Sequence, residues 1–180
     1  MLKKSTRWKE AGIIADLGGH DECLDVNCAH KLTVGEERVQ EILEKLGIVY
    51  VHQVNLIGLK DDPSKSFRIA DFYLPEHEIF IEYEGGYATA SKEGRDNEHK
   101  RYFQKKEVYK INRIPCICLY PGDDFALETY IEDGIEDIEN ENNEVIHYAK
   151  NFQEEYSADL DDLEEVLYEA YAESSWENTE

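Results

Sequence analysis

The sequence has few cysteines and lacks any long apolar run. Its four cysteines, in a chain of 180 residues, are too few for a disulfide-bonded scaffold, which favours a reducing compartment. No segment approaches the roughly 20 consecutive apolar residues that a membrane span needs, and no apolar stretch of the signal-peptide kind follows the basic start MLKKSTRWKE. These absences exclude disulfide-rich secreted proteins and membrane proteins. We therefore expect a cytoplasmic protein with no membrane partner.

Basic residues are almost missing from the last third of the chain. Residues 1–121 contain 18 lysines and arginines against 20 acidic residues, whereas residues 122–180 contain one lysine against 21 acidic residues. Nearly all of the net charge of −22 therefore belongs to the C-terminal part. Because Pro121 and Gly122 are turn signals, we predict three segments: residues 1–32, a folded core at residues 33–124 and an acidic extension at residues 125–180.

One predicted β-hairpin stands at the centre of the chain. Two runs rich in β-branched and aromatic residues, 67–74 and 79–83, flank a polar break of four residues. If the residues that border this break pair with each other, Asp71 stands directly opposite Glu82. Facing carboxylates repel each other across a ladder, whereas a divalent cation between them would make the arrangement favourable. The hairpin therefore indicates a metal site, unless both side chains lie on a solvated sheet face.

The other elements form an alternating pattern of helices and strands. A helix is predicted after Thr33, which has the spacing of a capping box with Glu36. A strand at 48–59 precedes the hairpin, and a helix at 96–112 and a buried strand at 114–120 follow it. Because a crossover helix joins parallel strands, we expect an α/β fold with a mixed sheet.

The N-terminal segment has a helix pattern followed by a cluster of potential metal ligands. The helix is expected between Ser5 and Gly18. Two histidines and two cysteines within eleven residues would suit a tetrahedral structural Zn²⁺ site: His20, Cys23, Cys28 and His30. Their spacing matches no established zinc motif, which favours the simpler interpretation of free thiols and surface imidazoles.

The predicted helix at residues 96–112 is basic. Arg101 and Lys105 are four residues apart and share one helix face, as do Lys106 and Lys110. Such a face is either solvated or in contact with phosphate groups. Two further cysteines, in the strand that follows, are interpreted as small hydrophobic core residues.

Taken in order, the helix acid, the acidic hairpin and the basic helix resemble the PD-(D/E)XK, or restriction-endonuclease-like, nuclease superfamily. The resemblance covers residues 33–124. The segment Arg68-Ile69-Ala70-Asp71-Phe72 is similar to the family's first acidic strand, with alanine in place of its proline. The segment Ile81-Glu82-Tyr83-Glu84-Gly85 is similar to its second acidic strand. The chain looks most like the small members that are related to very-short-patch-repair endonucleases.

The resemblance implies a restriction-endonuclease-like sheet and a site for phosphodiester hydrolysis. Glu84 occupies the position of the family's lysine, so Lys105 is expected to supply the ammonium group instead. The residues expected to act in catalysis are Asp71, Glu82, Glu84, Lys105 and Glu36. Those expected to hold Mg²⁺ or Mn²⁺ are Asp71, Glu82 and Glu36. DNA contacts are expected from Arg101, Lys100 and Lys106.

The acidic extension leaves two classes of function open. From Ser157 onward the sequence predicts an amphipathic acidic helix. This helix would either pack its apolar face on the nuclease domain and solubilise it, or repel DNA and restrain a nuclease until a basic partner removed it. The first class is a metal-dependent DNA endonuclease. The second is a non-catalytic binding protein, or DNA mimic, that engages a basic protein. A Lys105 ammonium close to Asp71 and Glu82 would favour cleavage, and cutting both strands of a duplex would require a dimer.

Overall fold

The structure is a computed structural model, and it describes residues 7–10, 12–16, 32–60, 62, 67–85, 92–120, 126–140 and 146–148. For residues 7, 10, 92–100 and 148 it describes the backbone alone. The predicted acidic helix after Ser157 lies outside the described residues, as do the four candidate zinc ligands: His20, Cys23, Cys28 and His30. No helix in the described part of the chain is long and apolar enough to cross a membrane.

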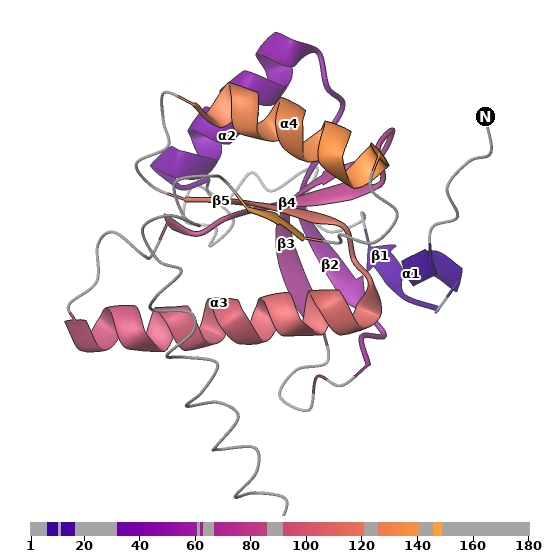
Figure 1. The fold of residues 1–180 in the computed structure, drawn as a ribbon, viewed down its shortest axis with the longest axis vertical. Helices are drawn as coiled ribbons and strands as arrows, with labels where there is room; N and C mark the ends of the chain where they lie inside the picture. Colours follow the sequence, from indigo (N-terminus) through magenta and orange to yellow (C-terminus); the bar gives the residue numbers. More distant parts are fainter. Residues whose placement is uncertain are drawn as a thin grey trace, which may run out of the picture. The chain divides into compact units, whose positions relative to one another are not determined.

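A six-stranded mixed sheet forms the centre of the fold (Figure 1). Its strands are β1 (Ile14–Asp16), β2 (Val51–Ile57), β3 (Phe67–Leu74), β4 (Ile79–Tyr83), β5 (Cys116–Leu119) and β6 (Ile146–Tyr148). They lie side by side in chain order. The pairs β1–β2, β2–β3 and β3–β4 are antiparallel, whereas β5 runs parallel to β4, and β6 runs parallel to β5. The predicted α/β class with a mixed sheet is confirmed.

Helices cover both faces of this sheet. They are α1 (Arg7–Glu10), α2 (Val34–Leu46), α3 (Lys92–Asn112) and α4 (Leu127–Asn140). Figure 1 shows α2 and α4 on one face and α3 on the opposite face. α3 connects the parallel strands β4 and β5, as the sequence predicts.

The β3–β4 hairpin has the bounds and the register predicted from the sequence. Its ladder starts with the pair Leu74–Ile79 beside the turn and continues to the pair Phe72–Ile81. All four of these side chains are buried. The turn at residues 75–78 fixes this register, because the two residues that border it pair with each other. The next position along the hairpin holds the two acids of the predicted metal site.

α2 confirms the predicted capping box. The Thr33 hydroxyl accepts a hydrogen bond from the Glu36 N–H, and the Glu36 carboxylate accepts one from the Thr33 N–H at 2.6 Å. The helix ends at Gly47, whose φ of 69° is left-handed. Val39 and Leu43 are buried. The cap therefore holds Glu36 at the start of a helix that is anchored in the core.

The N-terminal helix is shorter than predicted. α1 ends at Glu10, and Gly12 has a φ of 83°, a left-handed conformation that does not continue a helix. The chain then runs as β1, which is antiparallel to β2. Trp8 and Ile13 are buried. Ile14 is 61% exposed, because it lies in the outermost strand of the sheet and not on a helix face.

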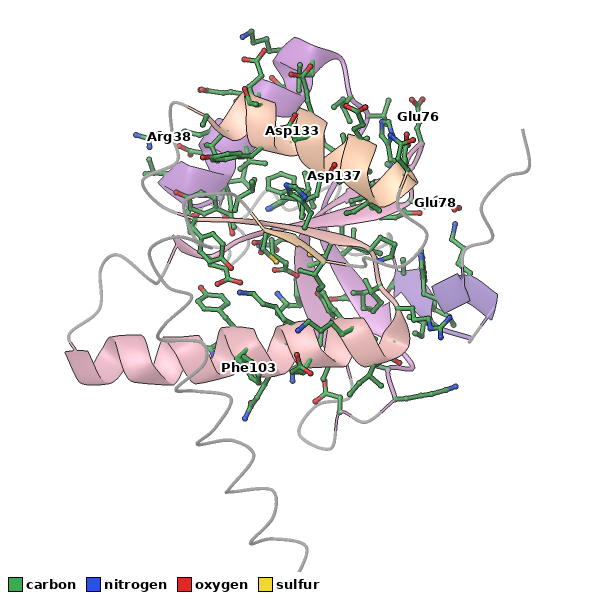
Figure 2. The ribbon with its side chains drawn as sticks, in the orientation of Figure 1. Arg38, Glu76, Glu78, Phe103, Asp133 and Asp137 are labelled. Atoms are coloured by element: carbon green, nitrogen blue, oxygen red, sulfur yellow. The ribbon has the colours of Figure 1, made fainter. Side chains whose placement is uncertain are left out.

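The sheet domain extends further toward the C-terminus than the predicted boundary at residue 125. The compact unit spans Met1–Ala149, so α4 and β6 belong to it. Apolar residues of α4 are buried at helical spacing, together with one glycine: Leu127, Tyr130, Ile131, Gly134 and Ile135. Acidic residues such as Asp133 and Asp137 occupy other positions of α4 (Figure 2). His147 Nδ1 of β6 lies 3.0 Å from Asp137 Oδ2. The number of acidic residues alone assigns α4 to the acidic extension, although its apolar residues follow an amphipathic pattern.

Candidate active site

The two acids of the hairpin lie where the β3–β4 ladder ends. Asp71 on β3 and Glu82 on β4 come directly after its last pair, Phe72–Ile81. In place of a further ladder bond, Asp71 Oδ2 accepts a hydrogen bond from the Tyr83 N–H at 2.7 Å. This bond holds the Asp71 carboxylate against the backbone of β4, next to Glu82.

α3 supplies two partners for Glu82. Lys105 Nζ lies 2.5 Å from Glu82 Oε2, and the Tyr109 hydroxyl donates to Glu82 Oε1 at 2.6 Å. Lys105 and Tyr109 are four residues apart and therefore project from one face of the helix. The Glu82 side chain is 6% exposed and that of Lys105 is 19% exposed. The Glu82 side chain is thus nearly enclosed, and the Lys105 side chain is mostly buried.

The surroundings of Asp71 change its protonation. Burial raises the pKa of Asp71 well above its usual value of 3.8, and the Glu82 charge raises it further. Glu36, at the start of α2, adds a smaller repulsion, whereas Lys105 and the Tyr83 N–H lower the Asp71 pKa. For Lys105, burial opposes the charged form, but the carboxylates of Glu82 and Asp71 outweigh it and raise the Lys105 pKa. The site therefore disfavours the ionised form of Asp71 and favours the charged form of Lys105.

This donor set fits a divalent cation. Carboxylate oxygens are preferred ligands of Mg²⁺ and Mn²⁺, and a cation would oppose the burial and the Glu82 charge that together raise the Asp71 pKa. Among the residues that the structure describes, no three His, Cys, Asp or Glu side chains form a group that could hold a metal ion. Besides carboxylates, hard cations also accept backbone, amide and water oxygens.

Glu84 forms an ion pair with Lys106 and not with Lys105. Its side chain is 3% exposed and lies 2.8 Å from Lys106 Nζ, which also donates to the Tyr120 hydroxyl at 2.6 Å. Burial raises the pKa of Glu84, and the charge of Lys106 opposes this shift. Glu84 was expected to act in catalysis and Lys106 to contact DNA, but the structure places them together in a buried ion pair.

The remaining predicted residues lie around the acid pair. The Glu36 carboxylate accepts the Thr33 N–H at 2.6 Å, and its charge also influences Asp71. Glu36 therefore serves the helix cap while lying near the site. Arg101 is exposed on α3, one turn before Lys105. Only the backbone of Lys100 is described.

The hydroxyl of Tyr109 is a site feature that the sequence interpretation missed. The spacing of four residues between Lys105 and Tyr109 was a usable sequence signal. Burial and the Glu82 charge raise the pKa of Tyr109 well above its usual value. The hydroxyl therefore stays protonated and acts as a donor. Cys116 and Cys118 are buried free thiols, which confirms their interpretation as small core residues.

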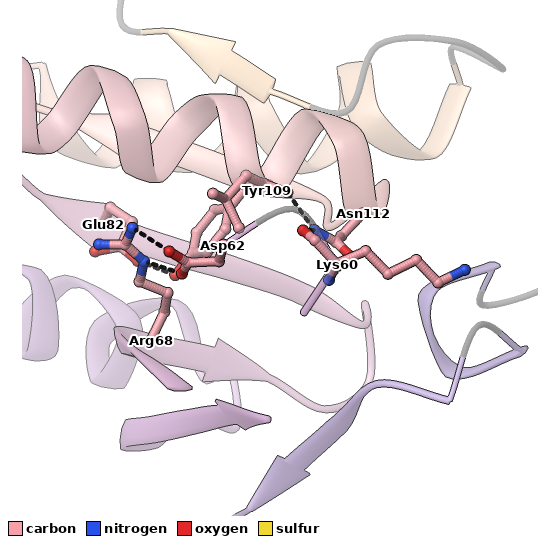
Figure 3. A network of polar contacts seen from close by, with 7 residues as sticks. Lys60, Asp62, Arg68, Glu82, Tyr109 and Asn112 are labelled. Carbon is pink, nitrogen blue, oxygen red and sulfur yellow. Dashed lines mark hydrogen bonds and ion pairs between the residues drawn. The ribbon is translucent and has the colours of Figure 1, made fainter. Parts of the chain in front are cut away.

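A second polar network anchors the segment between β2 and β3 (Figure 3). Arg68 Nε and Nη2 contact the two carboxylate oxygens of Asp62 at 2.6 and 3.0 Å. At the end of α3, Asn112 accepts the Lys60 N–H at 2.8 Å and donates to the Lys60 carbonyl at 2.9 Å. These contacts join this segment to β3 and α3, the two elements that carry the first acid and the lysine of the site.

Gly35 in α2 leaves room for the ring of Tyr83. A Cβ at position 35 would lie 1.9 Å from Tyr83 Cε1, so Gly35→Ala is expected to displace this ring and to destabilise the fold by about 1–3 kcal/mol. Urea unfolding measures the loss. The double variant Gly35→Ala, Tyr83→Leu removes the clash and is expected to recover part of the stability. A Gly35→Ala protein as stable as the wild type would contradict this close approach.

Comparisons with known proteins return no match. No protein-family model, no curated protein and no solved structure matches this chain. A functional inference therefore depends on the fold, on the site and on the resemblance of its motifs.

Proposed function

We propose that this protein is a cytoplasmic, metal-dependent endonuclease that hydrolyses phosphodiester bonds in DNA. The observation that carries the proposal is the position of the Lys105 ammonium. It lies 2.5 Å from Glu82 and close enough to Asp71 to influence the pKa of that residue. A lysine beside two carboxylates supplies an ammonium group that can orient the attacking water. An acidic surface without a lysine has no such group. Here the lysine comes from α3 and not from β4.

The order of the elements supports a restriction-endonuclease-like core. α2 precedes the antiparallel strands β2, β3 and β4, and α3 then leads to the parallel strand β5. α2 and α3 lie on opposite faces of the sheet (Figure 1). The two acids on β3 and β4 and the lysine on α3 follow one another in the order that the family resemblance implies.

Each side chain of the site has a role in this proposal. Asp71 and Glu82 would hold Mg²⁺ or Mn²⁺, and the charge of Glu36, which raises the Asp71 pKa, would also favour a cation there. Such a cation would stabilise the charge that develops on the phosphate and lower the pKa of a water molecule. Lys105 donates hydrogen bonds that orient the attacking water, and Tyr109 fixes the Glu82 carboxylate. As the water oxygen bonds to phosphorus and gives up a proton to solvent, the bond to the leaving oxygen breaks and that oxygen takes up a proton from solvent.

Substrate contacts and control complete the proposal. Arg101, exposed on α3, would hold a DNA phosphate with its planar guanidinium group. Residues 150–180 are strongly acidic, and we expect them to restrain or target the nuclease until a basic protein binds them. Cutting both strands of a duplex would require a dimer.

Lys105→Met is expected to lower the rate of DNA cleavage by about 10²–10⁴-fold, because the group that orients the attacking water is lost. Lys110→Met is the matched control. Lys110 lies on the same helix and pairs with Glu107, but its side chain is 44% exposed. Nicking of plasmid DNA in the presence of Mg²⁺ measures both rates, and circular dichroism verifies that both variants are folded.

The same assay separates the two classes of function. A folded Lys105→Met protein that cleaves DNA at the wild-type rate would show that Lys105 has no catalytic role. If the wild type binds no metal and cleaves no DNA structure, the better interpretation is a non-catalytic binding protein with a basic protein partner.

A further inference from the structure

Gln53 in β2 has two unusual properties. Its φ of 53° is left-handed, which is a strained conformation for a residue other than glycine. Its side-chain oxygen Oε1 is buried without a hydrogen-bond partner, and such a group destabilises a fold unless something compensates it. Strained residues of this kind cluster at sites that bind or react with ligands.

The strand register places Gln53 opposite Asp71. β2 and β3 form pairs on both sides of this position: His52–Phe72 and Val54–Ala70. Between them Gln53 and Asp71 face each other without forming a ladder pair. Pairing with β4 also stops beside Asp71. The strained glutamine therefore lies next to the acid at which both ladders are interrupted.

We infer that the Gln53 amide oxygen is a third protein ligand of the cation held by Asp71 and Glu82. This inference rests on the proposed function. A hard divalent cation takes about six oxygen ligands, and amide oxygens are among those it accepts. Two carboxylates leave several of these positions open. A cation would also give the unsatisfied oxygen a partner, which explains why a strained and unpaired amide is kept beside the acid.

Two substitutions of Gln53 are expected to change metal affinity in opposite directions. Gln53→Met keeps the length of the side chain and removes the oxygen, so Mn²⁺ is expected to bind about tenfold more weakly. Without metal, this variant is expected to unfold at the same or a higher temperature. Gln53→Glu adds a carboxylate beside Asp71. It is expected to bind Mn²⁺ more tightly and, without metal, to unfold at a lower temperature, because like charges repel.

Electron paramagnetic resonance of Mn²⁺ with the full-length protein measures the affinity. The site is identified as the binding that Asp71→Asn removes, which separates it from Mn²⁺ on the acidic C-terminal residues. Thermal unfolding in EDTA measures the metal-free stability. Asn55→Leu, an amide-to-apolar change two residues along β2, is the control and is expected to leave the Mn²⁺ affinity unchanged.

The outcomes distinguish the inference from the proposed function. Binding that depends on Asp71 but is unchanged in Gln53→Met would overturn the role of Gln53 and leave the nuclease proposal intact. A wild type that binds no Mn²⁺ at Asp71 would overturn both. Lower stability of both Gln53 variants, with unchanged Mn²⁺ affinity, would show that Gln53 has only a structural role.

Discussion

Asp71→Asn is expected to make the protein more stable at neutral pH and to abolish nuclease activity. Burial and the Glu82 charge raise the pKa of Asp71 in the folded state, so folding disfavours its ionised form. Asparagine has nearly the same shape and keeps an oxygen that can accept the Tyr83 N–H, but it has no charge. Each unit of pKa shift corresponds to about 1.4 kcal/mol, and 1 kcal/mol moves the Tm of a chain of this size by about 2–4 °C.

The gain in stability depends on pH in a defined direction. A carboxyl group whose pKa is raised by folding stabilises the protein fully below its unfolded pKa, and this contribution is lost as the pH rises through the folded pKa. At or below about pH 4, wild type and Asp71→Asn are therefore expected to unfold at similar temperatures. As the pH rises above 3.8, the usual pKa of an aspartate such as Asp71, the variant is expected to become the more stable of the two. Thermal unfolding in EDTA over this range measures the difference.

Mg²⁺ is expected to raise the Tm of the wild type but not that of Asp71→Asn. A ligand that binds the folded state raises the Tm by mass action, and Asp71→Asn lacks one of the two charges that would hold the cation. If the variant unfolds at a lower temperature than the wild type at neutral pH in EDTA, the electrostatic explanation of Asp71 is wrong. If Mg²⁺ shifts both proteins equally, the cation does not bind at Asp71.

Lys106→Met is expected to destabilise the fold by about 3–5 kcal/mol, because the Glu84 carboxylate stays buried without a counter-charge. The Lys106 and Glu84 side chains are only 10% and 3% exposed, and their charged groups are 2.8 Å apart. Protonation of Glu84 would remove the unpaired charge. The loss of stability is therefore expected to shrink as the pH falls, and denaturant unfolding at several pH values measures it.

Two further variants control this experiment. Lys110 and Glu107 form an ion pair of the same length on the same helix, but their side chains are 44% and 40% exposed. Lys110→Met is therefore expected to cost less than about 1 kcal/mol. The double variant Lys106→Met, Glu84→Gln leaves no buried charge and is expected to recover most of the stability. Equal stability of Lys106→Met and Lys110→Met would leave Lys106 available for the DNA contact predicted from the sequence.

The hairpin and α2 could be predicted from the sequence because their determinants are local. A polar break that begins with Pro75 separates two apolar runs, and the length of this turn sets the register of the hairpin. The capping box at Thr33 and the left-handed Gly47 mark the two ends of α2. The acid pair follows from these features, since the register alone brings Asp71 next to Glu82.

The C-terminal part of the sheet could not be predicted from charge. Acidic residues dominate after residue 121, which suggested a separate extension. The buried residues of α4 have helical spacing, but their significance depends on a sheet face that the helix can cover. β6 has only three residues, and so short a strand gives no recognisable pattern of its own.

Tertiary packing decides which charges of α3 reach the site. The spacing of four residues places Lys106 and Lys110 on the same helix face. In the structure, however, Lys106 is buried against Glu84, while Lys110 stays at the surface. This orientation of α3 depends on the buried residues Val108 and Tyr109 and on the strands beneath them. The left-handed φ of Gln53 has no sequence signal at all, because glutamine is not a residue that favours this conformation.

Cleavage of supercoiled plasmid DNA by the full-length protein tests the proposed nuclease most directly. The wild type is incubated with Mg²⁺ or Mn²⁺, beside the same protein in EDTA and beside folded Asp71→Asn. We expect nicked or linear DNA only from the wild type with a metal ion. Cleavage by Asp71→Asn at the wild-type rate would contradict the proposed site, and the absence of cleavage by a wild type that binds Mn²⁺ at Asp71 would contradict the proposed reaction.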